Sequence, residues 1–413
     1  MTANHFRNWA GLLLLLFAFS TVGRANPPWF TRVWQIDDGL LDNDINGITQ
    51  GPDHYLWLVT PVGLMQFDGI NFSPFPTEQL DRQATHIRIA FRGRGGILWL
   101  AFDGGKIIGL NPDFSRVSLE NSRLPGRAPL ALADDREGAL WLGYPGSIYR
   151  IKAGQPRRLT ARDGLPSGNF HSLSGDGAGN VWLAKGNQVG CFVDGTFRQI
   201  ASILGVQAMG AARANAIWIA ANRHLISCDV NGKEIDCGAF QGRSGARATA
   251  LLEDRNGAVW IGTDGSGLFH YNAAGFTRVR TSHSTILSLA QDDEGNIWVG
   301  TGGGGLDRIS PRSIQVETLE NDHIQSQIQS ICQDETGGLW GATRNGGLVR
   351  QIGGNWTPVF TNASFAGMVN CVAAGRSGAV WAGTRDGELL KIVTTNWIVC
   401  RTNIARGTVR GLF

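Results

Sequence analysis

The chain has 413 residues, with 37 Lys and Arg against 34 Asp and Glu, so its formal net charge is +3. So small a charge on so long a chain argues against the basic surface of a nucleic-acid-binding protein. Charged residues make up 17% and hydrophobic residues 42%, which excludes a disordered chain. The 57 glycines are about twice the average share and lack the period of collagen, so they predict frequent turns.

The first 25 residues have the three parts of an export signal. Arg7 precedes the apolar run 11–19, and the small residues Gly23 and Ala25 follow it. We expect cleavage after Ala25, with retention as an uncleaved anchor as the alternative, although the run is shorter than the roughly 20 residues of a spanning helix. No later segment is apolar enough to cross a bilayer. The mature chain is therefore expected in the periplasm or outside the cell, where disulfides form.

A repeat of about forty residues organises the rest of the chain. Tryptophans recur at intervals of 36 to 42 residues, most of them preceded by a turn glycine and followed by a second turn. The nine repeat tryptophans are Trp57, Trp99, Trp141, Trp182, Trp218, Trp260, Trp298, Trp340 and Trp381. Such a period indicates a repeat architecture and has to be recognised before individual elements are assigned.

Each repeat holds four short candidate strands, and none has the 3.6-residue period of an amphipathic helix. In the first copy the strands are predicted at 45–50, 56–60, 64–68 and 72–75. Four strands in about 40 residues are typical of a β-propeller blade, so the fold is predicted to be an all-β propeller. A lone four-stranded sheet cannot bury both faces, and the repeat tryptophans are expected where neighbouring blades cover each other.

Recurring positions within the repeats also suggest roles for aspartates and glycines. An aspartate stands six positions before five of the tryptophans and is expected to bond the amides of the intervening turn. These aspartates are Asp135, Asp176, Asp254, Asp292 and Asp334. The glycine run 302–305 lies between two strands rather than before a helix, so it does not predict a phosphate-binding loop.

The cysteines and histidines do not form a recognisable metal or cofactor motif. Cys332 and Cys371 occupy repeat positions where other copies have small residues, which predicts small buried thiols. Cys228 and Cys237 flank an Asn-Gly turn, so a cross-strand disulfide between them is a candidate. Cys191 has no evident mate, nor does Cys400. The eight histidines lack metal-ligand spacing, and we predict no metal and no cofactor.

No catalytic constellation is evident, and no catalytic residue is predicted. The sequence contains neither a G-x-S-x-G elbow nor an H-E-x-x-H motif. Propeller sialidases have an Asp-box turn before a tryptophan, but there the spacing is five rather than six. The chain has only four tyrosines from which a sialidase nucleophile could come, and no matching arginine cluster is evident.

Two motifs carry a resemblance to a known family. The segment 33–75, VWQIDDGLLDNDINGITQGPDHYLWLVTPVGLMQFDGINFSPF, resembles the start of two-component regulator propeller repeats, and the DGLPSGNF element at 163–170 is similar to the same pattern. These repeats occur in periplasmic sensor regions of hybrid histidine kinases and related regulators. The resemblance implies a non-catalytic, ligand-sensing region of a two-component signalling protein. Blades four and five depart from the pattern, since they lack the Gly-Thr pair after the tryptophan.

Members of that family usually have two seven-bladed propellers, an immunoglobulin-like domain, a membrane helix and an output module. We therefore expect residues 31–315 to form a first ring of seven repeats and residues 316–413 to begin an incomplete second ring. A single ring of nine or ten blades is the alternative. Residues 31–36 are expected to be a lone fourth strand that closes the first ring. The chain then ends at the first strand of a tenth repeat, which indicates truncation before the membrane and output domains.

A ligand is expected at the loops that surround one end of the central channel. Two repeat positions reach these loops: thirteen residues before the tryptophan and four residues after it. The ligand-binding candidates are Asp44, His86, Asn169, Arg247, Gln327, Asp103, Asn222, Asp264, Arg344 and Arg385. This polar set predicts a polar or carbohydrate-like small ligand.

Three functions remain open at this level. The first is the sensor, with homodimerisation in the full-length protein and membrane association only through a missing C-terminal part or an uncleaved signal. The second is a propeller enzyme, either streptogramin-lyase-like or active on glycans, because propellers host many chemistries. A lyase would need a histidine such as His86, His283 or His323. The third is a secreted scaffold that binds proteins. Nucleic acid is not an expected partner in any of them.

Overall fold

The structure is a computed structural model. It describes residues 29–77, 80, 86–193, 195–213, 215–243, 245–311, 327–352, 355–360, 368–393, 396–400 and 407–412. The predicted export signal at 1–25 lies outside these residues, as does His323. The chain divides into two compact units, Met1–Ser313 and Ile314–Phe413. Within the described ranges, no helix is both long and apolar enough to cross a membrane.

The predicted all-β propeller fold is confirmed. The described residues form nine antiparallel four-stranded sheets, seven in the first unit and two in the second. In the first unit, sheet one is β2 (Gly47–Gln50), β3 (Leu56–Thr60), β4 (Gly63–Phe67) and β5 (Phe72–Phe75). Sheet two is β6 (Ile87–Arg92), β7 (Leu98–Phe102), β8 (Ile107–Leu110) and β9 (Arg116–Val117). Sheet three is β10 (Ala131–Asp134), β11 (Leu140–Tyr144), β12 (Ser147–Lys152) and β13 (Gln155–Leu159).

The next three sheets follow the same strand order. Sheet four is β14 (Phe170–Gly175), β15 (Val181–Lys185), β16 (Gln188–Val193) and β17 (Thr196–Ser202). Sheet five is β18 (Val206–Ala211), β19 (Ala216–Ala221), β20 (His224–Asp229) and β21 (Glu234–Ala239). Sheet six is β22 (Ala248–Glu253), β23 (Val259–Thr263), β24 (Leu268–Asn272) and β25 (Gly275–Val279).

Sheet seven joins the two ends of the first unit. It contains β26 (Ile286–Gln291), β27 (Ile297–Thr301) and β28 (Leu306–Pro311), and its fourth strand is β1 (Trp29–Trp34) from the start of the described chain. In this pairing Trp29 lies opposite Pro311 and Trp34 opposite Leu306. The lone fourth strand predicted at 31–36 is therefore present, shifted by two residues. Because β1 pairs with β28, which is far from it in sequence, the pairing joins the two ends of the ring.

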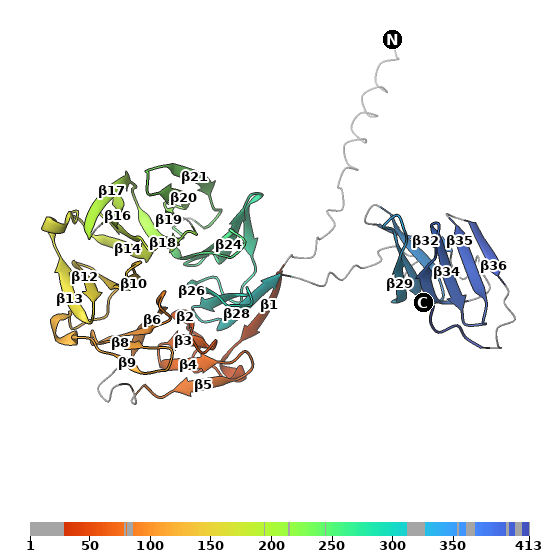
Figure 1. The fold of residues 1–413 in the computed structure, drawn as a ribbon, viewed down its shortest axis with the longest axis horizontal. Coiled ribbons are helices and arrows are strands. Elements are labelled where there is room, and N and C mark those ends of the chain that lie inside the picture. The colour runs from red at the N-terminus through yellow and green to blue at the C-terminus, as the bar shows by residue number, and fades with distance from the viewer. Residues whose placement is uncertain are drawn as a thin grey trace, which may run out of the picture. The chain divides into compact units, whose positions relative to one another are not determined.

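The seven sheets form a closed ring (Figure 1). Their first strands are neighbours in the order β2, β6, β10, β14, β18, β22 and β26, and β26 also lies against β2. The second unit has two sheets of the same kind. They are β29 (Ile328–Gln333), β30 (Leu339–Thr343), β31 (Leu348–Ile352) and β32 (Asn355–Phe360), then β33 (Val369–Ala374), β34 (Ala379–Thr384), β35 (Leu389–Val393) and β36 (Asn396–Cys400).

The DGL elements that suggested the family form short capped turns. Residues Ile36–Asp38 and Ala161–Asp163 are the 3-10 helices η1 and η4, and a third such turn, η3, spans Asn121–Arg123. The aspartates Asp38 and Asp163 each accept an amide N–H three residues earlier at 2.8 Å. The following glycines have φ of 104° and 79°, a left-handed conformation that glycine adopts at little cost. The turns η1 and η4 each lie in the connection from a fourth strand to the first strand of the next blade.

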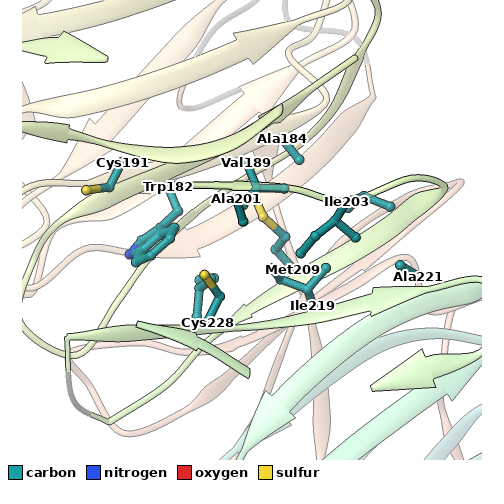
Figure 2. Packing of buried hydrophobic residues seen from close by; sticks show 12 residues of the cluster. Trp182, Ala184, Val189, Cys191, Ala201, Ile203, Met209, Ile219, Ala221 and Cys228 are labelled. Carbon is teal, nitrogen blue, oxygen red and sulfur yellow. The ribbon is translucent and has the colours of Figure 1, made fainter. Parts of the chain in front are cut away.

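The repeat tryptophans lie between blades. Seven of the nine are buried, whereas Trp218 and Trp381 are half-buried. Figure 2 shows one interface, in which Trp182 of sheet four packs toward sheet five among residues such as Met209, Ile219 and Cys228. Each interface of the first ring has a hydrophobic cluster that includes one repeat tryptophan. The indoles therefore cover the sheet faces that a single blade would leave in water.

The repeat aspartates connect each turn to its tryptophan. In Asp254, Oδ1 accepts the amide N–H groups of Asn256 and Ala258, and Oδ2 accepts the indole N–H of Trp260 at 2.8 Å. The corresponding indole bonds measure 2.7–2.9 Å. They join Trp141, Trp182, Trp298 and Trp340 to Asp135, Asp176, Asp292 and Asp334. With six residues from aspartate to tryptophan, one carboxylate can accept both the turn amides and the indole N–H.

Burial alone would favour the neutral form of these carboxylates. In Asp334 the desolvation is outweighed by hydrogen bonds from the Thr336 hydroxyl, the Trp340 indole and the turn amides, so its pKa is lowered. The pKa of Asp135 is also lowered, because bonds from Trp141 and Arg150 outweigh its burial. Asp135 and Asp334 therefore stay ionised and bonded within the interface.

A second set of hydrogen bonds crosses from blade to blade. The amide after the repeat aspartate position donates to a side chain of the next blade: Arg213 to Glu253 at 3.0 Å and Arg255 to Gln291 at 2.9 Å. The last bond of the series runs from the amide of Asp293 to Gln50 at 3.0 Å and joins sheet seven to sheet one. The ring is thus closed by polar bonds as well as by β1.

The disulfide predicted as a candidate between Cys228 and Cys237 is not formed, because both residues are free thiols. Cys228 faces the interface of sheets four and five beside Trp182, whereas Cys237 packs with Tyr271 on the opposite interface. In the hairpin Cys228 pairs with Glu234, three residues before Cys237. Because side chains alternate between the two faces of a strand, this odd offset puts the two cysteines on opposite faces. Burial raises the pKa of Cys228 to about 12, which keeps its thiol protonated.

We predict that Asp254→Ala lowers the free energy of unfolding by about 1–3 kcal/mol, because it leaves the Trp260 indole N–H and two turn amides without an acceptor. Urea unfolding followed by tryptophan fluorescence measures this loss. The matched control is Glu234→Ala on the exposed strand β21, which is expected to change stability by less than about 0.5 kcal/mol. Equal losses in the two variants would contradict a structural role for the carboxylate.

Candidate functional site

In the first unit, the two sets of predicted ligand residues meet at one end of the ring. This loop end carries the connections from each fourth strand to the next first strand and the turns between second and third strands. The residue thirteen before the tryptophan offers its carbonyl, and the residue four after the tryptophan donates its amide N–H to it. Each blade with this bond therefore presents two side chains next to each other at the loop end.

These bonds recur with nearly constant length. In the first unit they join Asp103 to His86 at 3.0 Å, Gly186 to Asn169 at 2.8 Å, Asp264 to Arg247 at 2.8 Å, and Gly302 to Thr285 at 2.9 Å. In the second unit they join Arg344 to Gln327 at 2.7 Å and Arg385 to Met368 at 2.8 Å. The repeat register thus places the two candidate positions of a blade side by side.

Two blades reach the same arrangement differently. Asp44 forms an isolated bridge with Gly302, so sheet one meets sheet seven at this position. Asn222 lies beside Gly205 in sheet five, and its side-chain amide donates to the carbonyl of Leu204 at 3.1 Å. The turn there takes left-handed φ values of 48° at Asn222 and 70° at Arg223, which replaces the missing Gly-Thr turn.

Most of the candidate side chains are exposed. His86, Asn169, Arg247 and Asp264 reach solvent in the first unit, while Asp103 is half-buried. Asp103 forms an ion pair with the Nε of Arg88, and Asp264 lies 3.5 Å from the Thr285 hydroxyl of the next blade. These contacts leave a polar surface formed by several blades.

Three candidates belong to the second unit. The side chain of Arg344 donates to Oε1 of Gln327 at 3.3 Å, and Arg385 donates to the carbonyl of Arg344 at 3.3 Å. The structure brings these three together within their own unit. They are therefore a separate group from the candidates of the first ring.

One part of the loop end was not singled out by the sequence. Ser282, in the connection between β25 and β26, donates its amide N–H to Oδ2 of Asp307 at 2.7 Å. Asp307 is completely buried on β28, and its Oδ1 has no hydrogen-bond partner. Burial raises the pKa of Asp307 to about 6, although the bonds from Ser282 act in the opposite direction. Asp307 is two residues beyond the glycine run, and no repeat pattern marks it.

The described residues contain no group of three or more His, Cys, Asp or Glu side chains that could hold a metal ion. A lyase would need one of His86, His283 and His323, and the first two are exposed at the loop end. The amide of Thr285 donates to Nδ1 of His283 at 3.1 Å, so the neutral ring carries its proton on Nε2. The imidazole of His283 is thus oriented to present an N–H.

The family of the repeats follows from two segments of the first ring. Residues 242–265 and 282–303, which span the loop-end positions of sheets six and seven, match the family model of the two component regulator propeller. The resemblance inferred from the sequence is confirmed. No match was found among curated proteins.

Solved structures agree with this fold. The extracellular domain of the hybrid two component system BT3049 from B. thetaiotaomicron has a TM-score of 0.58 and 18% identity, over 94% of this chain and 55% of that one. The extracellular domain of the one component system BT4673 from the same organism has a TM-score of 0.56 and 18% identity, over 89% and 53%. The chain therefore spans about half of the length of these two structures.

A propeller enzyme is also similar. Virginiamycin B lyase from Staphylococcus aureus has a TM-score of 0.55 and 14% identity, over 68% of this chain and 99% of the lyase. At such identities the likeness establishes the propeller fold and does not transfer an activity.

The buried side chain of Asp307 is expected to make the stability of the protein depend on pH. The pKa of Asp307 is about 6 in the folded protein against 3.8 as the ordinary value, so the folded state binds the proton more tightly. Asp307 therefore costs stability progressively as pH rises from about 4 to about 7. We expect Asp307→Asn to raise the free energy of unfolding by about 2–3 kcal/mol more at pH 7.5 than at pH 4. Urea unfolding at both pH values tests this, and a difference independent of pH would contradict it.

Proposed function

We propose that this chain is the extracytoplasmic, ligand-sensing propeller region of a two-component signalling protein, and that it binds its ligand without converting it. The two component regulator propeller repeats and the likeness to extracellular domains of B. thetaiotaomicron signalling systems support this function. The proposal also includes an N-terminal export signal at 1–25 and a longer full-length protein that dimerises and carries an output module.

The observation that carries the proposal is the loop end of the closed ring. Its backbone is held by amide–carbonyl bonds within four of the seven blades, while side chains such as Arg247, Asp264 and His86 reach solvent. Rigid scaffolds that present polar side chains from several loops are suited to binding small polar molecules. We therefore propose a polar, carbohydrate-like ligand for this surface.

The test is binding without turnover. Wild-type protein is expected to bind at least one member of a panel of neutral oligosaccharides of five to eight sugars, measured by isothermal titration calorimetry, and to leave it chemically unchanged. The double variant Arg247→Ala/Asp264→Ala is expected to weaken that binding about tenfold, since it removes one donor and one acceptor.

The control is Lys233→Ala/Glu234→Ala, which removes the same two charges from the turn between β20 and β21 at the opposite end of the ring. This variant is expected to bind as wild type does. Cleavage of an oligosaccharide, or equal weakening by both double variants, would contradict the proposed sensing surface.

A lyase is the second candidate, because the similarity to virginiamycin B lyase extends over 99% of that enzyme. Incubation of the chain with virginiamycin B separates the two functions. Turnover that is abolished by His283→Ala would establish the lyase and contradict the sensor, whereas an unchanged substrate supports the sensor.

A further inference from the structure

An open pocket with a volume of about 390 Å³ lies at the seam between sheets six and seven. It is lined by the continuous segment 278–284, which leads from β25 into β26. Among the described residues that line it, none belongs to the predicted ligand set and none is acidic. The pocket therefore has its own chemistry and does not depend on the proposed signalling role.

Two arginines give the pocket a positive charge. Arg278 and Arg280 both line it, both are exposed, and neither has an ion pair with any described residue. A pocket of about 460 Å³ at the opposite end of the ring provides the contrast. There Arg150 is 2.7 Å from Asp135, and Lys152 is 2.8 Å from Glu137, so these two basic groups are already paired with carboxylates. Arg278 and Arg280 remain available to an anion.

The rest of the lining adds neutral donors. The Nδ1 of His283 accepts the amide of Thr285, so the neutral imidazole keeps its N–H on Nε2. Ser284 contributes a hydroxyl to the lining, whereas the Thr281 hydroxyl already donates to the carbonyl of His283 at 2.8 Å. Guanidinium, imidazole N–H and hydroxyl groups are hydrogen-bond donors that suit a ligand with several acceptor oxygens.

The segment is held in place by neighbouring strands. The amide of Gly267 donates to the carbonyl of Ser284 at 2.7 Å, and the amide of Ser282 donates to Asp307 at 2.7 Å. Gly304 makes this packing possible, because a Cβ there would lie 2.5 Å from the Ser282 hydroxyl oxygen. The glycine run thus serves close backbone packing against the pocket segment. A fixed segment lowers the ordering cost of binding.

Two carboxylates border the pocket without lining it. Asp307 lies beneath the segment and is bonded to Ser282, and Asp264 lies 3.5 Å from the hydroxyl of Thr285, one residue beyond the lining. Neither carboxylate is within salt-bridge distance of Arg278 or Arg280, since no such pair exists among the described residues. The two guanidinium groups therefore remain the unneutralised charges of the lining.

We propose that this pocket binds an oxyanion, a carboxylate or sulfate or phosphate group of a small polar molecule, through Arg278, Arg280 and the Nε2–H of His283. Arginine favours such groups because its planar fork of N–H donors matches two oxygens of one anion. The open volume of about 390 Å³ leaves room for a sugar-sized remainder beyond the anionic group.

The experiment titrates the full chain with sodium sulfate, sodium phosphate and D-glucuronate by isothermal titration calorimetry, with D-glucose as the neutral counterpart. We expect saturable binding of at least one of the three anions, no binding of glucose, and affinity that falls as NaCl is raised. Arg278→Gln/Arg280→Gln is expected to weaken the anion about tenfold or more. Tighter binding of glucuronate than of the inorganic anions would identify an acidic saccharide, and equal binding a simple oxyanion.

The matched control is Arg158→Gln/Arg198→Gln. These exposed arginines lie on β13 and β17, outside both pockets. Their substitution removes the same charge as the Arg278→Gln/Arg280→Gln variant. Circular dichroism and the unfolding midpoint check that each variant is folded, and His283→Ala provides a second variant if the double substitution unfolds. No saturable binding of any of the three anions, or equal weakening by the control pair, would overturn the proposal. Loss of oligosaccharide binding in Arg247→Ala/Asp264→Ala is a separate result and leaves it intact.

Discussion

A carboxylate that bonds both a turn amide and a repeat indole, present in six of the seven ring blades, is the interaction on which the ring depends. A buried carboxylate is costly unless its oxygens are paired, and Asp254 satisfies this by accepting two turn amides on Oδ1 and the Trp260 indole on Oδ2. The same bonds fix the direction of the indole, which then fills the gap to the next blade. Turn geometry and blade packing are therefore determined together, since neither can shift without exposing or orphaning a polar group.

Two of the three ring blades without this aspartate still bond the indole to a carboxylate, from another position. In sheet one Asp53, four residues before Trp57, takes the role at 3.3 Å. In sheet five Trp218 donates at 2.8 Å to Glu253, which comes from the following blade. The second solution makes the polar bond itself cross the interface, and it explains why sheet five departs from the repeat pattern while keeping its place in the ring.

The tryptophan period was sufficient to predict the sheets, because an indole at a blade interface imposes the same spacing on every copy. Strand bounds differed slightly: β2 begins at Gly47 rather than at 45. The predicted disulfide between Cys228 and Cys237 is wrong because the Asn-Gly turn indicates a hairpin but not its register, which pairs Cys228 with Glu234. The loop-end pairs could be located because both positions are counted from the tryptophan. The pocket could not, since Asp307, Gly267 and Gly304 approach its segment only in the folded ring.

The two ends of the ring use their side chains differently, and this division explains why binding is expected at one of them. At the turn end, side chains such as Asp254, Glu253 and Gln291 make the bonds that hold turns and blades, so their identity is constrained by folding. At the loop end, the recurring bond joins a backbone amide to a backbone carbonyl, as between Asp264 and Arg247. Almost any residue can make that bond. Folding therefore does not constrain the side chains at the loop end, and they can be suited to a ligand. Stability does not explain why polar and basic residues accumulate there.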